Sequence, residues 1–469
     1  MRRACVVGAG PNGLAAAIVL AQAGFRVDVL EAQPTAGGAA RTMDLTLPGF
    51  HHDFGSAVHP LAVGSPFFSS LPLGEHGLKW IHSPVALAHP FDDGSVVTVA
   101  RGIANGADSL GIDRDAWNKL IGEFATHWDE FSPEVLRQIP FVPSNPFMMA
   151  RFGALAVLPA RMVARRFRSE RTRALFAGMA AHSFLSLDEP LSAAFGLLMA
   201  ISACAVGWPI PRGGAQSIAT ALCGVLKSLG GTVRVSSPVT SLAELEGYDV
   251  LLCDVTPRQL AQIGAGQFSR SYVRQLHRFR YGVGVFKVDY ALRHPIPWKA
   301  WDCSQAATVH IGGTFDEIAA SEAAVRSGRH AARPFVLVAQ PSLFDDSRAP
   351  AGQHTAWAYC HVPNGSDVSA LESIENQIER FAPGFRDCVL ARRVFTPSDL
   401  EAMDDNLVGG DIGGGAMDLW QFLFRPTWRG YATSARNVYI CSASTPPGGG
   451  VHGMCGYHAA TTALARLKN

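Results

Sequence analysis

The sequence predicts an α/β fold of two interleaved domains, in which an α/β domain alternates along the chain with an α+β domain that has a mixed sheet and a helical lid. Two units predict the α/β domain, because an apolar strand leads into a glycine-rich turn and a helix near both ends, around residues 4–14 and 437–457. A third observation predicts the other domain: residues 110–211 are mostly helical in pattern, and residues 259–424 alternate between strands and helices.

The opening turn carries its glycines at Gly8, Gly10 and Gly13, in the pattern G-x-G-x-x-G. Gly8 permits the tight turn, Gly10 lets the backbone approach a pyrophosphate, and Gly13 lets the helix pack closely on the strand. The alanine-rich helix that follows from Leu14 offers the free N–H groups of its N-terminus and the positive end of its dipole to phosphates, and Pro11 and Asn12, in the turn before it, are further candidate contacts. The pattern therefore predicts a Rossmann-like, dinucleotide-binding unit.

A second strand is predicted at residues 26–30, and Glu31 and Ala32 follow it. Glu31 comes 18 residues after Gly13, the spacing expected of a carboxylate that binds ribose hydroxyls. A glycine-rich surface turn before an ordinary helix is the simpler interpretation of the motif, but it leaves Glu31 unexplained.

A second glycine pair, Gly37 and Gly38, again lets backbone approach a ligand. Arg41 follows and can pair with a phosphate oxygen. Thr42 and Gly55, the latter ending an Asp-Phe-Gly turn, are further candidate contacts of the dinucleotide. A nicotinamide dehydrogenase does not need this second pair, and the chain has no second G-x-G-x-x-G unit after a strand.

Near the C-terminus, a predicted buried strand at residues 437–444 leads into a run of small residues and a helix starting near Tyr457. A run of glycines permits backbone amides to touch the edge of a flat ring. The candidate contacts in this run are Ser444, Gly450, Val451 and His452. A glycine-rich loop that closes a sheet is the alternative interpretation.

Glu31, the Gly-Gly-x-x-Arg run and the Asp-Phe-Gly turn resemble the flavoprotein superfamily of amine oxidases and phytoene desaturases, which binds FAD. One branch of the phytoene-dehydrogenase-related oxidoreductases includes the vertebrate pyridine nucleotide-disulphide oxidoreductase domain 2 proteins and bacterial relatives. Motifs of this chain resemble that branch at residues 307–314, 358–365, 408–412 and 444–453. The resemblance covers nearly the whole chain and implies FAD as cofactor, with the backbone at Val239 supporting the adenine.

The domains that follow are discontinuous in sequence. The FAD-binding domain is predicted to contain residues 1–80, 205–258 and 425–469. The substrate-binding domain is predicted to contain residues 81–204 and 259–424, with a helical subdomain at about 110–204.

The 469 residues carry a formal net charge of +1, which argues against a nucleic-acid partner. The nine cysteines are odd in number and form no C-x-x-C pair, so neither a disulfide framework nor a dithiol redox centre is expected. No metal-binding spacing occurs, and no metal is expected. Because the first strand begins within a few residues of Met1, no targeting peptide and a cytoplasmic location are expected.

The resemblance implies that a flavin carries the chemistry, with a hydride passing from substrate to its N5 atom. Candidate catalytic side chains are His452, in the glycine run, His361 and Tyr359, which alternate on one strand, and Asp411, in a glycine-flanked loop. For each of them, a structural role satisfied by nearby backbone is the competing interpretation.

The function expected from this combination is desaturation or dehydrogenation of an apolar or natural-product substrate, with oxygen or a quinone as electron acceptor. A flavin-dependent isomerase or saturase of an isoprenoid-like substrate is an alternative, and a non-catalytic lipid-escort protein is another. Residues 146–173 combine apolar and arginine side chains, which indicates either peripheral membrane contact or a solvated helix face. The sequence predicts neither the substrate nor the oligomeric state.

Overall fold

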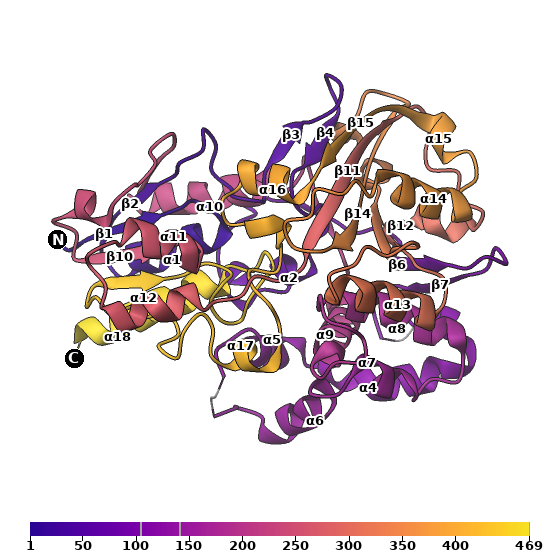
Figure 1. Ribbon diagram of the computed structural model, residues 1–469, viewed down its shortest axis with the longest axis horizontal. Helices are drawn as coiled ribbons and strands as arrows, with labels where there is room; N and C mark the ends of the chain where they lie inside the picture. The colour runs from indigo at the N-terminus through magenta and orange to yellow at the C-terminus, as the bar shows by residue number, and fades with distance from the viewer. Residues whose placement is uncertain (104–105, 140–141, 469) are drawn as a thin grey trace.

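The computed structural model describes residues 1–103, 106–139 and 142–468 and contains two main sheets (Figure 1). Among the described residues, five parallel strands form the first sheet in the order β16-β10-β1-β2-β9. Their bounds are β1 (Arg3–Val7), β2 (Arg26–Leu30), β9 (Thr232–Arg234), β10 (Val250–Cys253) and β16 (Val438–Ile440). The strands predicted at both ends of the chain therefore lie in one sheet, and the predicted Rossmann-like fold is confirmed.

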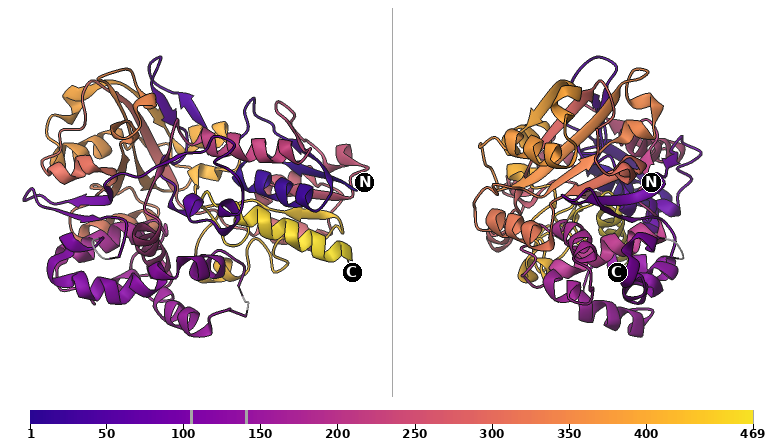
Figure 2. Two further views of the ribbon diagram at one scale, coloured as in Figure 1. Left: turned by 180° about the vertical axis from the view of Figure 1, so that it is seen from behind. Right: turned by 90° about the vertical axis from the view of Figure 1, so that its right-hand side faces the viewer.

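Helices cover both faces of this parallel sheet because successive strand residues point to opposite sides. Val6, Val29 and Leu252 pack toward α1, α10 and α18, whereas Cys5 and Leu251 pack toward α11 and α12. The helices are α1 (Pro11–Gln22), α10 (Gln216–Ser228), α11 (Pro257–Ile263), α12 (Arg270–His277) and α18 (Met454–Lys468). Both chain ends lie at this part of the molecule (Figures 1 and 2).

The second sheet is mixed, as expected for the α+β domain. In the described part of the chain it has seven strands in the order β15-β11-β14-β13-β12-β6-β7, with β12 and β6 parallel and the other neighbours antiparallel. The bounds are β6 (Val85–Pro90), β7 (Val96–Val99), β11 (Gly284–Leu292), β12 (Ala306–Ile311), β13 (Val336–Ala339), β14 (His354–Val362) and β15 (Val389–Phe395). Helix α14 (Leu371–Phe381) packs its apolar residues on one face, and α13 (Phe315–Arg326) lies against the helical layer.

The helical layer predicted before residue 205 lies below this mixed sheet in Figure 1. Its helices are α4 (Arg114–Thr126), α5 (Trp128–Val135), α6 (Pro146–Ala156), α7 (Ala160–Ala164), α8 (Glu170–Ala181) and α9 (Ser192–Ala205). Helix α9 contains most of the uncharged stretch near residues 191–210 and packs against α8, α4 and α6. Within the described ranges, no helix combines the length and apolarity needed to cross a bilayer.

Shorter elements connect these layers. They are β3 (Thr42–Asp44), β4 (His51–Asp53), β5 (Trp80–Ile81), β8 (Ile210–Pro211), α2 (Pro60–Val63), α3 (Pro66–Ser69), α15 (Phe385–Cys388), α16 (Pro397–Met403) and α17 (Leu419–Leu423). Strands β3 and β4 form a hairpin that carries the residues after Arg41.

The arginine-rich segment 146–173 forms α6, α7 and the start of α8. Several of its arginines are ion-paired: Arg151 with Glu123, Arg161 with Asp188 and Asp316, and Arg171 with Asp93. These pairs neutralise part of the charge that an anionic membrane would attract. Membrane contact through this segment stays a prediction.

Candidate functional site

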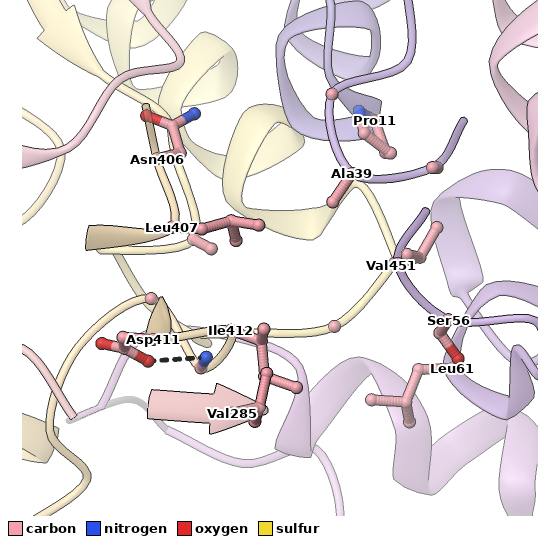
Figure 3. A pocket seen from close by; sticks show the side chains of 18 of the residues that line it. Pro11, Ala39, Ser56, Leu61, Val285, Asn406, Leu407, Asp411, Ile412 and Val451 are labelled. Carbon is pink, nitrogen blue, oxygen red and sulfur yellow. Dashed lines mark hydrogen bonds between the residues drawn. The ribbon is translucent and has the colours of Figure 1, made fainter. Parts of the chain in front are cut away.

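A cavity of about 340 Å³ lies where the two glycine-rich ends of the chain meet the mixed sheet. Figure 3 shows Pro11 and Ala39, from the N-terminal segments, on the same side as Val451, and Ile412 beside Val285. The cavity walls combine the glycine segments, the loop after α16, strand β11 and the end of the helical layer. Ten of the predicted site residues line it: Gly10, Pro11, Asn12, Gly38, Gly55, Tyr359, Asp411, Ser444, Gly450 and Val451.

The opening turn has the close packing that its glycines predict. A Cβ atom on Gly13 would lie 2.1 Å from the carbonyl oxygen of Gly8, and one on Gly10 would lie 2.8 Å from Oδ2 of Asp254. The Gly13 N–H donates a hydrogen bond of 2.8 Å to the same Asp254 oxygen. Gly8 and Gly13 therefore permit the close packing on the side of the turn away from the cavity, whereas Gly10 lines the cavity.

Glu31 is buried at the end of β2 and braces this turn. One carboxylate oxygen accepts the Ala9 N–H at 2.7 Å, and the other accepts the Gln33 N–H at 2.9 Å. An ionised carboxylate has about four acceptor sites, so Glu31 keeps acceptor capacity for a ribose hydroxyl. The segment containing Val239 runs alongside, since the Ser237 N–H donates to the Glu31 carbonyl at 2.8 Å.

Val239 itself packs against the apolar cluster behind the parallel sheet and does not line the cavity. Ala32 is exposed just after Glu31. Their predicted contacts with the adenosine end of a dinucleotide stay predictions.

Arg41 is buried and holds the second glycine turn in place. Its Nε donates to the Gly38 carbonyl and a terminal nitrogen donates to the Met403 carbonyl, each at 2.7 Å. The guanidinium also lies over the Phe54 ring, 5.1 Å from its centroid. Arg41 and Gly37 do not line the cavity, so the predicted phosphate contact of Arg41 stays a prediction.

Thr42 also lies behind the cavity wall, and its hydroxyl donates to Asp53 at 2.8 Å. Asp53 in turn accepts the Ala215 N–H at 2.7 Å. Buried hydrogen bonds to Asp53 therefore connect β3, β4 and the start of α10. The predicted residues Thr42 and Gly55 lie on either side of these bonds.

Three buried polar atoms along the glycine-rich walls have no hydrogen-bond partner among the described residues. They are Asn12 Oδ1, His59 Nε2 and Ser444 Oγ. Buried polar atoms in proteins are nearly always hydrogen-bonded, so unpartnered ones at a cavity wall indicate a polar ligand. Asn12 belongs to the opening segment of α1, where the sequence predicts a dinucleotide.

Two of the four candidate catalytic residues lie outside the cavity wall. His452 lies behind Gly450 and accepts the Met454 N–H on Nδ1 at 3.0 Å. Burial lowers the pKa of His452 to about 4, which keeps the ring neutral. This bond starts α18 at Met454, three residues before the predicted start. His361 is also buried, and its Nδ1 bonds Glu322 at 2.7 Å.

The other two candidates line the cavity. Tyr359 stacks on Trp357, with ring centroids 5.7 Å apart, and burial raises the pKa of its phenol. Asp411 accepts the N–H groups of Gly282 and Gly413, both at 2.7 Å, as Figure 3 shows for one of them. Burial raises the pKa of Asp411. Asp411 therefore joins two loops at the wall, and its catalytic role stays a prediction.

Lys287, the charged group of β11 that lines the cavity, was not among the residues predicted from the sequence. Its ammonium pairs with Asp289 at 2.5 Å and lies 5.6 Å and 5.7 Å from the ring centroids of Trp357 and Phe395. The sequence pattern could have indicated Lys287, because Lys287 and Asp289 lie two residues apart in an otherwise apolar strand. Charged side chains on a buried strand are rare unless they are paired with an opposite charge or have a function.

Asp254 was also missed, and its pH dependence is testable. Burial, opposed by the Gly13 N–H, raises the pKa of Asp254 to about 8. Between pH 4 and 8 the unfolded chain therefore releases this proton while the folded chain keeps it. Folding then takes up a proton, and stability falls as pH rises, by up to about 1.4 kcal/mol per pH unit.

Asp254→Asn is expected to remove this contribution, because the amide oxygen still accepts the Gly13 N–H and has no proton to lose. Urea unfolding of the variant at pH 5 to 8 should show a shallower fall in stability than the unchanged protein. Asp346→Asn, which changes a carboxylate exposed at 86%, is the control and should keep the original slope. Parallel profiles for Asp254→Asn and the unchanged protein would contradict the assignment.

Known proteins match this chain in two ways, over its N-terminal segment and over nearly its whole length. Residues 6–67 match the family model of an NAD(P)-binding Rossmann-like domain. Pyridine nucleotide-disulfide oxidoreductase domain-containing protein 2 of Mus musculus is 25% identical over 99% of this chain and 94% of the mouse protein. Phytoene desaturase (lycopene-forming) of Pseudescherichia vulneris is 24% identical over 99% of each chain. The structure of wild-type putrescine oxidase bound to putrescine has a TM-score of 0.62 at 17% identity, covering 100% of this chain and 99% of the other.

The chain is therefore an enzyme of the Rossmann-fold oxidoreductase class. Over nearly its whole length it is similar in sequence to the mouse protein and to the phytoene desaturase, and it has the same fold as putrescine oxidase. The superfamily resemblance stated from the sequence is confirmed.

Proposed function

We propose that this protein binds FAD and oxidises an apolar or natural-product substrate by taking a hydride from it, as a desaturase or dehydrogenase. One observation carries the proposal: both glycine-rich ends of the chain open into a single cavity whose remaining walls are mostly apolar. The names of the related phytoene desaturases support an apolar substrate. Oxygen or a quinone is the proposed electron acceptor.

The residues present fit FAD. Gly10 lines the cavity at the start of α1, and Asn12 Oδ1 and Ser444 Oγ are unpartnered within the part of the chain that the structure describes. Acceptor capacity on Glu31 suits a ribose. FAD, when bound, supplies a two-electron acceptor, which no side chain of this protein offers.

The protein's own contribution is binding, orientation and charge. The apolar wall formed by Leu61, Phe195 and Met199 can hold an apolar substrate and exclude water. Lys287 places a positive charge at the wall, where it can stabilise negative charge that develops during reduction. This geometry suits hydride removal better than it suits simple lipid carriage, which needs neither the glycine turns nor the cation.

The proposal is tested by anaerobic mixing of the purified protein with long-chain alcohols, aldehydes, amines and isoprenoids, without external reductant. A substrate that is oxidised should bleach the oxidised-flavin absorbance band. Conversion of substrate without bleaching would instead indicate an isomerase. Protein that never binds flavin would contradict the proposal.

Lys287→Met in the background Asp289→Asn removes the cation without leaving an unpaired buried carboxylate. With a substrate identified as above, this double variant is expected to bind FAD normally but to reduce it roughly 100-fold more slowly, in the range seen when one stabilising donor is lost. Stopped-flow absorbance measures the rate. Lys299→Met, whose ammonium bonds the Arg380 carbonyl away from the cavity, is the matched control. An unchanged rate in the double variant would exclude this role for Lys287.

A further inference from the structure

Two residues of the cavity wall formed by the mixed sheet and the helical layer carry buried polar atoms without a partner. Thr308, on β12, and Trp208, just after α9, both line the cavity and are 1% and 3% exposed. Neither Thr308 Oγ1 nor Trp208 Nε1 has a hydrogen-bond partner among the residues that the structure describes. Each such atom costs free energy unless a ligand satisfies it.

His182 completes this group, which we call the lid-side cluster: Thr308, Trp208 and His182. His310 lies two residues after Thr308 on β12, so both side chains are on one face of the strand. His310 Nε2 is 3.2 Å from His182 Nε2, and the Trp208 ring centroid is 5.7 Å from His310 and 5.8 Å from His182. The three members therefore gather around His310, and His182 lines the cavity beside the other two.

The lid-side cluster is electrically neutral. Burial lowers the pKa of His182 to about 3, so its ring carries no charge near neutral pH. The ionisable groups of the cavity wall lie elsewhere: Asp254, Asp404 and Asp411 are in loops, and Lys287 is paired with Asp289. A carboxylate or ammonium group placed at the cluster would lose its hydration without gaining an opposite charge.

The donors and acceptors of the cluster define a complementary ligand atom. The Trp208 N–H donates only, the Thr308 hydroxyl both donates and accepts, and a neutral His182 ring has Nε2 committed to His310. Nitrogen Nδ1 of His182 has no partner within the described ranges and remains available. A neutral oxygen satisfies this set, because it accepts from Trp208 and Thr308 and, as a hydroxyl, donates in return.

Apolar side chains surround the cluster. Phe184, Phe195, Met199 and Leu337 line the adjoining wall. The part of a substrate that lies against these four side chains is therefore expected to be apolar.

We propose that the substrate is an apolar molecule bearing one hydroxyl or carbonyl oxygen, which hydrogen-bonds to Thr308 and Trp208 beside His182. The inference rests on the proposed function, because that function assigns the glycine-rich walls to the cofactor and leaves the lid-side cluster to the substrate. It narrows the substrate class from hydrocarbons, amines and alcohols to neutral oxygenated compounds. Binding without this oxygen would leave the Thr308 and Trp208 donors unsatisfied.

The test compares ligands of one chain length by calorimetric titration of the protein as purified: octanol, octanal, octyl chloride, octylamine and octanoate. Octanol and octanal are expected to bind about tenfold more tightly than the other three, the effect of one or two neutral hydrogen bonds. Thr308→Val and Trp208→Phe are each expected to lower this preference to about threefold or less.

Thr355→Val is the matched control. Thr355 is also 1% exposed with an unpartnered hydroxyl among the described residues, but it lies on β14 and does not line the cavity. This variant should keep the tenfold preference, and any loss of folding in Thr308→Val is recognised by comparison with it. Equal affinity for octanol and octyl chloride, or a preference that survives both cluster variants, would overturn the inference.

The flavin absorbance of the same samples separates the two proposals. A colourless protein that still prefers octanol would refute the proposed function and leave the oxygen-binding cluster standing. A yellow protein whose flavin is reduced by a substrate, but which shows no preference among these ligands, would refute the cluster alone.

Discussion

Gly13→Ala is expected to abolish retention of the dinucleotide, lowering its affinity roughly 100-fold or more. The added methyl group would lie 2.1 Å from the Gly8 carbonyl oxygen and 3.0 Å from Asp254 Oδ2. Neither neighbour is a flexible chain end, so the turn and the start of α1 must move apart. Because the same turn must present backbone to the diphosphate, its displacement removes the binding site as well as some stability.

The variant is measured by the ratio of flavin to protein absorbance after purification and by titration with FAD. Gly153→Ala is the control, since Gly153 lies in α6 with no atom within 4 Å of the added methyl group. Alanine is the better helix former, so this control should bind flavin normally and be slightly more stable. Full flavin content in Gly13→Ala would show that the turn is not the binding site.

Arg348→Met is expected to reduce the free energy of unfolding by about 3–5 kcal/mol. Arg348 and Asp53 are both fully buried and paired at 2.5 Å. Although burial raises the pKa of Asp53, the guanidinium outweighs it and holds the pKa below its usual value. Without Arg348, an unpaired carboxylate would remain in the core, where it also bonds Thr42 and the Ala215 N–H.

Urea unfolding at a fixed FAD concentration measures this loss. Arg212→Met removes a neighbouring pair with Asp346 at 3.3 Å, whose side chains are 57% and 86% exposed. Solvent screening makes such a pair worth about 1 kcal/mol or less, so Arg212→Met should have little effect. The double change Arg348→Met with Asp53→Asn should recover part of the stability, because no buried charge is then left unpaired. Equal losses in the two single arginine variants would contradict the buried pairing.

The sequence was sufficient to predict a structural feature wherever the residues that form the feature are close together in the chain. The turn through Gly8, Gly10 and Gly13 is such a case, because strand, turn and helix are contiguous and each glycine has a local steric reason. The strand predicted at residues 26–30 is likewise contiguous with its turn, and the structure has it as β2.

Residues whose roles depend on distant partners were not predictable in this way. Asp254 meets Gly13 from 241 positions away, and Arg348 reaches Asp53 from 295 positions away. No spacing rule brings such residues together, because their contact depends on how the strands are ordered in the sheets. His452 illustrates a related limit: its place in the glycine run was correct, but the direction of the turn sends its ring toward the start of α18 instead of the cavity.

The central claim is that the two glycine-rich ends of the chain enclose one FAD. The most direct measurement is the absorption spectrum of the purified protein, together with the mass of the small molecule released when the protein is denatured. We expect a flavin spectrum and the mass of FAD, in a ratio of about one per chain, and neither in Gly13→Ala. A colourless protein that takes up no FAD, or one that releases a nicotinamide dinucleotide from this site, would contradict the claim.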